Sequence, residues 1–241
     1  MKFFIWLSVA LACVGCGTTT EGSRAAGKSP IAETQPSPPA DLAAKLPDSL
    51  RNDAYTYYGL GNDQPIALEL TQTSGKGPGT SSDGEVQVSL KDVKEGAATF
   101  DIVYGGDLQS TLGTNQMKLA KDGLHALSTA SGKVIGDDLE LPATLTNGTV
   151  WHTKNTVEAG GEKVVQDLVF KVVGRQNAVT KAKTYSDAWF VLGTGTMTRG
   201  GKSYKVEAKA WYVKDRGPVR QEMVIHTDPP SSVVIQERKA S

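Results

Sequence analysis

Cysteine is nearly absent from this 241-residue chain, which has only Cys13 and Cys16. Because both lie within the first 16 residues, the rest of the chain can form no disulfide, no cysteine metal site and no thiol nucleophile. Stability therefore has to come from a hydrophobic core. Hydrophobic residues make up 39% of the chain, which is typical of a globular protein.

An excess of charge of one sign is also missing. The chain has 26 basic and 26 acidic residues, so its formal net charge is zero. Proteins that bind nucleic acids generally need a surplus of lysine and arginine to neutralise phosphates. We therefore expect no nucleic-acid partner.

The sequence has no apolar run long enough to cross a bilayer as a helix. The longest one, residues 3–14, falls short of the roughly 20 residues that such a helix requires. It follows Lys2 and ends among small residues, which is the pattern of an export signal. The sequence therefore predicts export.

The two cysteines lie where this signal ends. The segment Cys13-Val-Gly-Cys16-Gly17 resembles the bacterial lipobox, whose cysteine is acylated and becomes the new amino terminus. We favour lipid attachment at Cys16, with Cys13 as the alternative register and an ordinary secretory signal as the third possibility. Acyl chains would anchor the protein to a membrane. Because Gly17 stands where an aspartate would resemble the inner-membrane retention signal, we expect the outer membrane if the organism has one.

Composition divides the remainder of the chain. Serine, threonine, glycine, alanine and proline dominate residues 17–40, and such a segment cannot bury enough apolar surface to fold. We expect a signal peptide, then the lipidated cysteine with a disordered tether, then a β-rich domain and finally a C-terminal tail that could add an edge strand at 233–235. Their bounds are 1–15, 16–40, 41–228 and 229–241.

Alternation of apolar and polar residues is the main structural signal in the domain. It runs through segments such as 85–90, 98–104 and 204–213, and turn signals such as Asp122-Gly123 separate them. Helical periodicity is scarce, apart from one or two turns at 41–46. We predict an all-β fold of about ten to twelve strands, as a single curved antiparallel sheet or an open barrel or sandwich, with at most one short N-terminal helix.

The second half of the chain carries a succession of motifs. Leu139-Glu-Leu-Pro142 precedes Gly148 and Trp151, and Trp211-Tyr-Val213 follows near the carboxyl end. This succession resembles the TapB-like group of bacterial domains of unknown function, most specifically over residues 139–222.

The resemblance extends more loosely over residues 53–226. It implies an exported, often lipid-anchored, β-rich protein shaped like the curved sheets of periplasmic lipoprotein carriers. It supplies no established activity and no catalytic residue. The sequence departs from the group's pattern at 215–218, where Asp-Arg-Gly-Pro replaces glycine-valine-glycine. We expect a turn there, with Trp211 and Tyr212 on opposite faces of the preceding strand.

Several residue patterns suggest chemistry, but each has a simpler structural explanation. His125, His152 and His226 lack metal-ligand spacing, and no Gly-x-Ser-x-Gly string occurs. We interpret Gly193-Thr-Gly-Thr196 as small residues at a bend, and Asp137-Asp138 as a polar hairpin turn in preference to a carboxylate pair or a calcium site. We therefore predict no catalytic residue, no metal and no cofactor.

The tryptophans bear most directly on ligand binding. Trp151, Trp189 and Trp211 could line an apolar groove, but we favour a place in the core because large aromatic residues are mostly buried for packing. We predict a non-catalytic, lipid-anchored envelope protein that binds an apolar ligand or a partner protein. The alternatives are an assembly protein that uses strand edges, and a hydrolase of envelope polymers.

Overall fold

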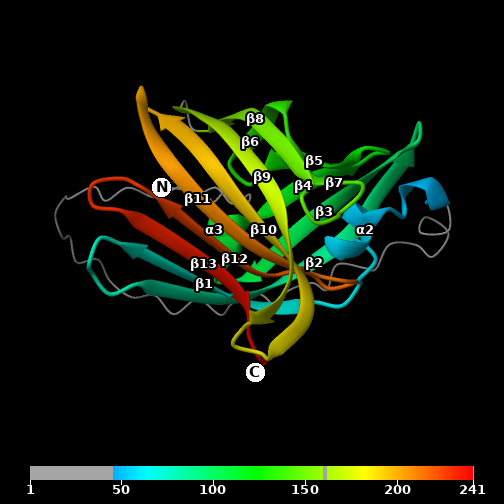
Figure 1. The fold of residues 1–241 in the computed structure, drawn as a ribbon, viewed down its shortest axis with the longest axis horizontal. Helices are drawn as coiled ribbons and strands as arrows, with labels where there is room; N and C mark the ends of the chain where they lie inside the picture. Colours follow the sequence, from blue (N-terminus) through cyan, green and yellow to red (C-terminus); the bar gives the residue numbers. More distant parts are fainter. Residues whose placement is uncertain (1–45, 160–161, 241) are drawn as a thin grey trace, which may run out of the picture.

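The structure is a computed structural model that describes residues 46–159 and 162–240. These residues form thirteen strands and three short helical segments (Figure 1). The helical segments are η1 (Asp48–Leu50), α2 (Asp53–Tyr57) and α3 (Gln109–Leu112). The strands are β1 (Ile66–Ser74), β2 (Thr80–Lys94), β3 (Ala97–Gly106), β4 (Thr114–Leu119), β5 (Gly123–Thr129), β6 (Gly132–Asp137), β7 (Leu139–Pro142), β8 (Val150–Ala159), β9 (Glu162–Val179), β10 (Thr184–Arg199), β11 (Lys202–Val213), β12 (Gly217–Ile225) and β13 (Ser231–Glu237).

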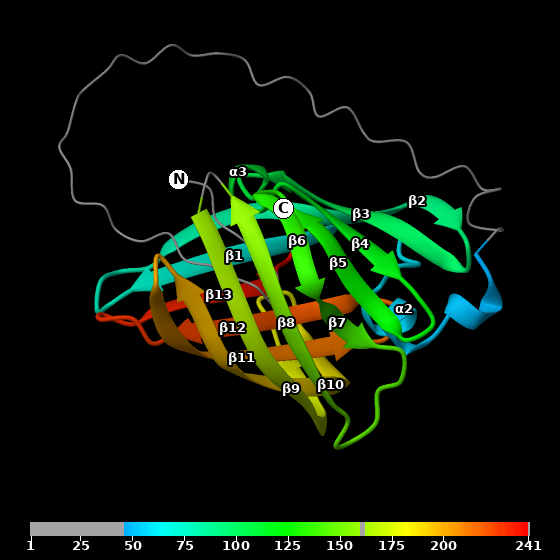
Figure 2. The ribbon, with the colours of Figure 1, turned by 90° about the horizontal axis from the view of Figure 1, so that it is seen from above.

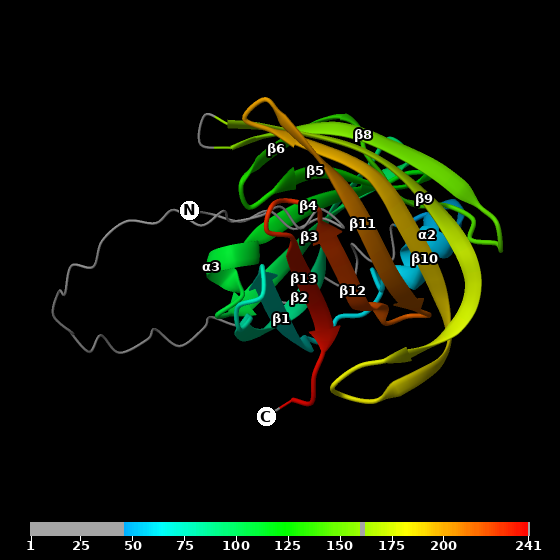
Figure 3. The same ribbon diagram turned by 60° about the vertical axis from the view of Figure 1, so that its left-hand side comes forward.

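Antiparallel pairing closes twelve of these strands into a barrel. The order runs β4-β3-β2-β1-β13-β12-β11-β10-β9-β8-β6-β5, and β4 pairs with β5 to complete the circle. β7 is an additional strand that pairs with β5. The predicted all-β, antiparallel fold is therefore confirmed. Figure 3 shows the long strands β8 to β11 curving around the interior.

The barrel is closed because the end of the chain belongs to it. β13 lies between β1 and β12, and its seven residues all pair with β1. The sequence assigned residues 229–241 to a tail with a possible edge strand, which is wrong for residues 231–237. Without β13, β1 and β12 would have no link, and the sheet would be the open one that the sequence predicted.

Side chains fill the interior. Residues at alternate positions point inward, as the period of a strand requires. The ring of Phe170 stacks on Trp151 at 5.3 Å, and Phe100, Leu168 and Tyr212 are almost completely buried. The twelve strands therefore enclose a packed core, and Figure 2 shows the walls that surround it.

Helix α2 closes one end of the barrel. The side chain of Asn52 accepts a hydrogen bond from the backbone N–H of Tyr55, which caps the helix. Asp53 then accepts a 2.7 Å hydrogen bond from the backbone N–H of Leu145, and the Asn52 amide donates to the Ala120 carbonyl. The helix is thus fastened to two loops of the barrel. The predicted turns at 41–46 lie outside the described residues except for Leu46, which is not helical, and α3 is one helix more than expected.

Candidate functional site

A cavity of ≈ 50 Å³ lies beside α2, within the wall of β1, β2, β3, β12 and β13. A site of this kind needs roughly 10–15 Å³ to hold a water molecule, and an engineered cavity of about 150 Å³ holds benzene. The space is therefore large enough for a few methylene groups at the end of a chain and too small for a whole benzene ring. The cavity is lined by Tyr58, Gly59, Asn62, Gln64, Ile66, Leu68, Val86, Val88, Ile102, Tyr104, Arg216, Pro218, Val219, Gln221 and Ile235.

The walls of the cavity differ in polarity. Aliphatic side chains from β1, β2, β3 and β13 form one side, and they face one another through the strand register, as Val88 pairs with Ile102. The polar groups come mostly from the segment that follows α2 and from the turn between β11 and β12, while β3 and β12 add Tyr104 and Gln221. The arrangement matches a ligand with an apolar end and a polar end, since apolar groups gain from leaving water and polar groups need partners.

Backbone contacts place Arg216 at this cavity. In the turn between β11 and β12, the backbone N–H of Asp215 donates a 2.9 Å hydrogen bond to the carbonyl of Thr56 in α2. Gly59 follows α2 with a φ of +73°, and a Cβ there would lie 2.8 Å from the carbonyl carbon of Arg216. Only glycine permits this approach without strain. The predicted turn is confirmed, and it carries a cavity residue.

Arg216 is one member of a polar triad built around the buried carboxylate of Glu237. Its Nη2 lies 2.5 Å from Oε1 of Glu237, whose side chain is 5% exposed. The hydroxyl of Tyr185 donates to the other oxygen of the same carboxylate. Burial raises the pKa of Tyr185 to about 12, and the hydrogen bond to Glu237 adds to the effect. Burial lowers the pKa of Arg216, but the bond and charge of Glu237 outweigh it and leave this pKa raised.

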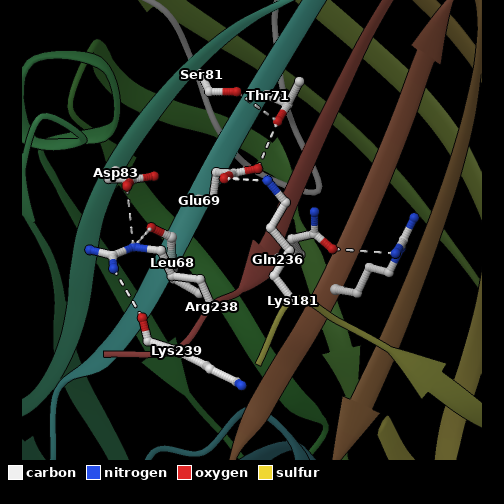
Figure 4. Close-up of polar contacts among 10 residues, drawn as sticks. Leu68, Glu69, Thr71, Ser81, Asp83, Lys181, Gln236, Arg238 and Lys239 are labelled. Atoms are coloured by element: carbon white, nitrogen blue, oxygen red, sulfur yellow. Dashed lines mark hydrogen bonds and ion pairs between the residues drawn. The ribbon is translucent and has the colours of Figure 1, made fainter. Parts of the chain in front are cut away.

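The hairpin between β9 and β10 brings Tyr185 to this triad. Figure 3 shows the yellow end of the hairpin bending away from the barrel wall toward the end of β13. Its tip is fastened by Lys181, whose Nζ lies 2.6 Å from Glu69 of β1 (Figure 4). Arg220 donates to the carbonyl of Val179 at 2.8 Å. These contacts hold the tip across the outer faces of β12, β13 and β1.

A buried carboxyl group, Glu140, lies behind the cavity. Its side chain comes from β7, the residue is 3% exposed, and its Oε1 has no hydrogen-bond partner in the described part of the chain. Burial raises its pKa to about 8, so the carboxyl is largely protonated at neutral pH. Burial raises the pKa values of Tyr58 and Tyr104 as well, and the charge that Glu140 carries when ionised raises them further. The sequence analysis did not identify Glu140.

The interpretation of Asp137-Asp138 as a polar hairpin turn is wrong. Asp138 is 3% exposed and its Oδ1 accepts a 2.9 Å hydrogen bond from Asn155 of β8. β6 pairs with β8 only up to Asp137, and β7 then pairs with β5. Asp138 lies at this break between β6 and β7. Its side chain bonds Asn155 of β8 just beyond the last backbone pair of β6 and β8.

The three histidines lie on different parts of the barrel. Each bonds one nearby carboxylate: His125 lies 3.2 Å from Asp122, His152 lies 2.7 Å from Asp167 and His226 lies 3.1 Å from Glu207. The hydrogen bonds from His152 and then Lys154 hold the pKa of Asp167 below its ordinary value. Within residues 46–159 and 162–240, no group of three possible metal ligands comes together.

The tryptophans pack in three separate places. Trp151 is a core residue, Trp189 packs against the core, and Trp211 stacks on Phe190 at 4.8 Å outside it, beside Ala178 and Val219. The prediction of a core position is therefore confirmed for Trp151, whereas Trp211 packs in a separate cluster, and none of the three lines the cavity beside α2. The cavity is lined by tyrosines instead.

The glycines at 193 and 195 mark a close approach of two strands. A Cβ on Gly193 would lie 2.4 Å from the ring of Phe170, and one on Gly195 would lie 2.1 Å from the carbonyl oxygen of Asp167. The prediction of small residues within a curved strand is confirmed. Cys13 and Cys16 lie outside the described residues, and none of the described helices has the length and apolarity to cross a membrane.

Neither a protein-family model nor a curated protein sequence matches the chain, so the resemblance to TapB-like domains stays a prediction. Solved structures do match. A protein from Bacteroides fragilis, described as exported and as having a YmcC-like fold, is 13% identical and superposes with a TM-score of 0.50, covering 74% of this chain and 97% of that one.

Two further structures align less well. One, described as a lipoprotein from Parabacteroides distasonis, is 12% identical with a TM-score of 0.48, over 76% of this chain and 98% of that one. The other, the hypothetical lipoprotein YmcC from Escherichia coli, is 10% identical with a TM-score of 0.35, over 83% and 93%. The Bacteroides fragilis protein shows that this chain has the YmcC-like fold.

Proposed function

We propose that this chain is a non-catalytic, lipid-anchored protein of the bacterial envelope that binds the narrow apolar end of an amphipathic ligand. The observation that carries the proposal is the cavity beside α2, which joins an aliphatic wall to a polar rim. The ligand's alkyl end would lie among Ile66, Val88 and Ile102, and its polar end would lie toward Arg216.

Two features support export and anchoring. Residues 3–14 and the cysteines that follow have the pattern of a lipoprotein signal. The Bacteroides fragilis protein that shares the fold is itself described as exported. We propose attachment at Cys16, with the domain held on the periplasmic or outer face of the outer membrane or cell membrane.

Barrel closure bears on the assembly alternative. Strand-edge binding requires a bare edge, but each of the twelve barrel strands has a neighbour on both sides.

The hydrolase alternative requires a nucleophile or a carboxylate pair in a cleft. The cavity offers tyrosine, amide and guanidinium groups instead. Both observations favour ligand binding without turnover.

Metabolic labelling tests the anchor. Cells that express the wild-type chain are grown with radioactive palmitate, and we expect the purified protein to carry the label. The Cys16→Ser variant should lose it, whereas Cys13→Ser should keep at least most of it. Label that persists in Cys16→Ser and disappears in Cys13→Ser would move the attachment site, and an unlabelled wild-type protein would contradict lipid anchoring.

Filling the cavity tests ligand binding. In the full chain with Cys13 and Cys16 replaced by serine, titration calorimetry should detect 1-octanol, whereas benzene should bind at least about tenfold more weakly because it has no polar end to bond the rim. Val88→Phe enlarges a lining side chain and should weaken octanol binding by at least about tenfold, because the larger side chain occupies space that the ligand needs. Val86→Phe should act in the same way.

The matched control is Val169→Phe. Val169 lies on β9 outside the barrel and is 45% exposed, so the same enlargement there should leave octanol binding unchanged. Circular dichroism reports whether each variant folds. No octanol binding to the wild-type chain, or equal binding to folded Val88→Phe and Val169→Phe, would overturn the proposal.

A further inference from the structure

We infer that the polar end of the ligand is an uncharged hydrogen-bonding group, such as an alcohol, ester or amide, and that the cavity discriminates against carboxylates and phosphates. The inference rests on the proposed function, because it specifies the chemistry of the same site. The charge balance around Arg216 carries it.

The cavity has one charged lining residue among those described, and its charge is already matched. Arg216 is paired with Glu237 at 2.5 Å, and that carboxylate is 5% exposed. Tyr185 donates to the second carboxylate oxygen, which satisfies the anion further. An ionised ligand entering here would lose its hydration without gaining a free counter-charge, and an unpaired buried charge is costly.

The remaining polar groups of the rim are neutral. Tyr58 and Tyr104 keep their hydroxyl protons at physiological pH, since burial and the neighbouring Glu140 raise both pKa values. Asn62, Gln64 and Gln221 contribute amides. Amides and hydroxyls can both donate and accept, so they match an alcohol, ester or amide without adding net charge.

One donor in this region lacks a partner. Nε of Arg216 is buried and makes no hydrogen bond within the described residues, although Nη2 of the same guanidinium bonds Glu237. A buried N–H without an acceptor costs free energy, which a ligand oxygen recovers if the guanidinium turns to expose Nε to the cavity. A carbonyl or hydroxyl oxygen can accept this bond and leave the Arg216–Glu237 ion pair intact.

A matched pair of ligands tests the inference. Titration calorimetry at pH 7.5, on the full chain with Cys13 and Cys16 replaced by serine, compares 1-octanol with octanoate, which share their chain length. We expect octanol to bind about tenfold tighter or more, because octanoate must bury its charge without a counter-ion. Glu237→Gln leaves Arg216 unmatched, so the preference for octanol over octanoate should fall about tenfold.

Glu207→Gln is the control variant. Glu207 carries the same charge on the exposed outer face, 3.1 Å from His226, and its replacement should alter neither affinity. The inference would be overturned if octanoate bound the wild-type chain as tightly as octanol and bound Val88→Phe more weakly. The proposed function would then still stand. An unchanged preference in folded Glu237→Gln would overturn the role of the ion pair. Binding of neither ligand would overturn both proposals, and the wild-type comparison decides even if Glu237→Gln does not fold.

Discussion

Replacing Glu140 with glutamine is expected to stabilise the barrel at neutral and mildly alkaline pH and to remove a pH dependence that the wild-type protein should show. Burial raises the pKa of Glu140 to about 8 in the folded chain, against an ordinary value of 4.5. Between these values the unfolded chain has released the proton while the folded chain retains it. The free energy of unfolding therefore decreases by about 1.4 kcal/mol for each pH unit in this range.

The sign of the effect follows from the direction of the shift. The contribution of Glu140 to stability is complete below pH 4.5 and is lost as the pH rises toward 8. Over the whole range the loss amounts to roughly 3–5 kcal/mol, which is a large part of the stability of a typical domain. Glutamine has the same shape as protonated glutamate and does not ionise. The free energy of unfolding of the variant should therefore not fall as the pH rises.

Urea denaturation at pH 5, 6, 7 and 8 measures this effect. The wild-type free energy of unfolding should fall with pH, and that of Glu140→Gln should stay nearly constant and exceed it at pH 8. Glu85→Gln is the control, because it makes the same substitution at an exposed position of β2. It should change the free energy of unfolding by no more than about 0.5 kcal/mol. A wild-type stability that is flat from pH 5 to 8 would show that Glu140 does not hold its proton.

Much of the barrel could be predicted because its signals are local. Asp122-Gly123 joins β4 and β5, and Glu95-Gly96 joins β2 and β3, as their turn chemistry indicates. The alternation in β11 likewise places Tyr212 inside and Trp211 outside. Such features depend on a few neighbouring residues, which is why the sequence alone specifies them.

Closure of the barrel could not be predicted in this way. β13 pairs with β1, and their residues are more than 150 positions apart, as in the pair Leu70 and Ile235. Its seven residues follow two prolines at the end of the chain, which resembles a frayed terminus in composition. The choice between a tail strand and a barrel strand depends on the unpaired edges of β1 and β12, and no local pattern describes those edges.

The candidate site was hidden for two physical reasons. Its lining residues lie between positions 58 and 235, so only the fold brings them together. Glu140 also stands between two leucines, and strict alternation would point it outward if Leu139 and Leu141 point inward. A register shift in the pairing of β7 with β5, between Leu139 and Leu141, changes this phase, so that Glu140 and Leu141 are both buried. A charged residue between two leucines, next to the predicted turn at 137–138, was the signal that could have identified it.

The second large effect is expected at Gly195, where alanine should destabilise the barrel by roughly 2–4 kcal/mol. A Cβ at this position would lie 2.1 Å from the carbonyl oxygen of Asp167 and 2.8 Å from the Cα of Leu168. Both are backbone atoms of β9, and they cannot move aside without opening the ladder between β9 and β10. In most strands glycine weakens the sheet, so a large loss on Gly195→Ala would be specific to this close approach.

Two neighbouring variants make the test sharper. Thr194→Ala changes an exposed residue of the same strand and should cost no more than about 0.5 kcal/mol. Gly193→Ala meets the ring of Phe170 at 2.4 Å, and because that ring stacks on Trp151 it can yield only slightly, so we expect an intermediate loss. Urea midpoints should therefore fall in the order Thr194→Ala, Gly193→Ala, Gly195→Ala, and equal midpoints would contradict the close packing of β9 and β10.

Ligand binding separates this structural role from the site. Neither Gly195 nor its neighbours Asp167 and Leu168 line the cavity beside α2. Under conditions where Gly195→Ala remains folded, it should therefore bind 1-octanol with the wild-type dissociation constant, whereas Val88→Phe should lose affinity while keeping most of its stability. A folded Gly195→Ala that bound octanol much more weakly would mean that the contact between β9 and β10 is coupled to the cavity across the barrel.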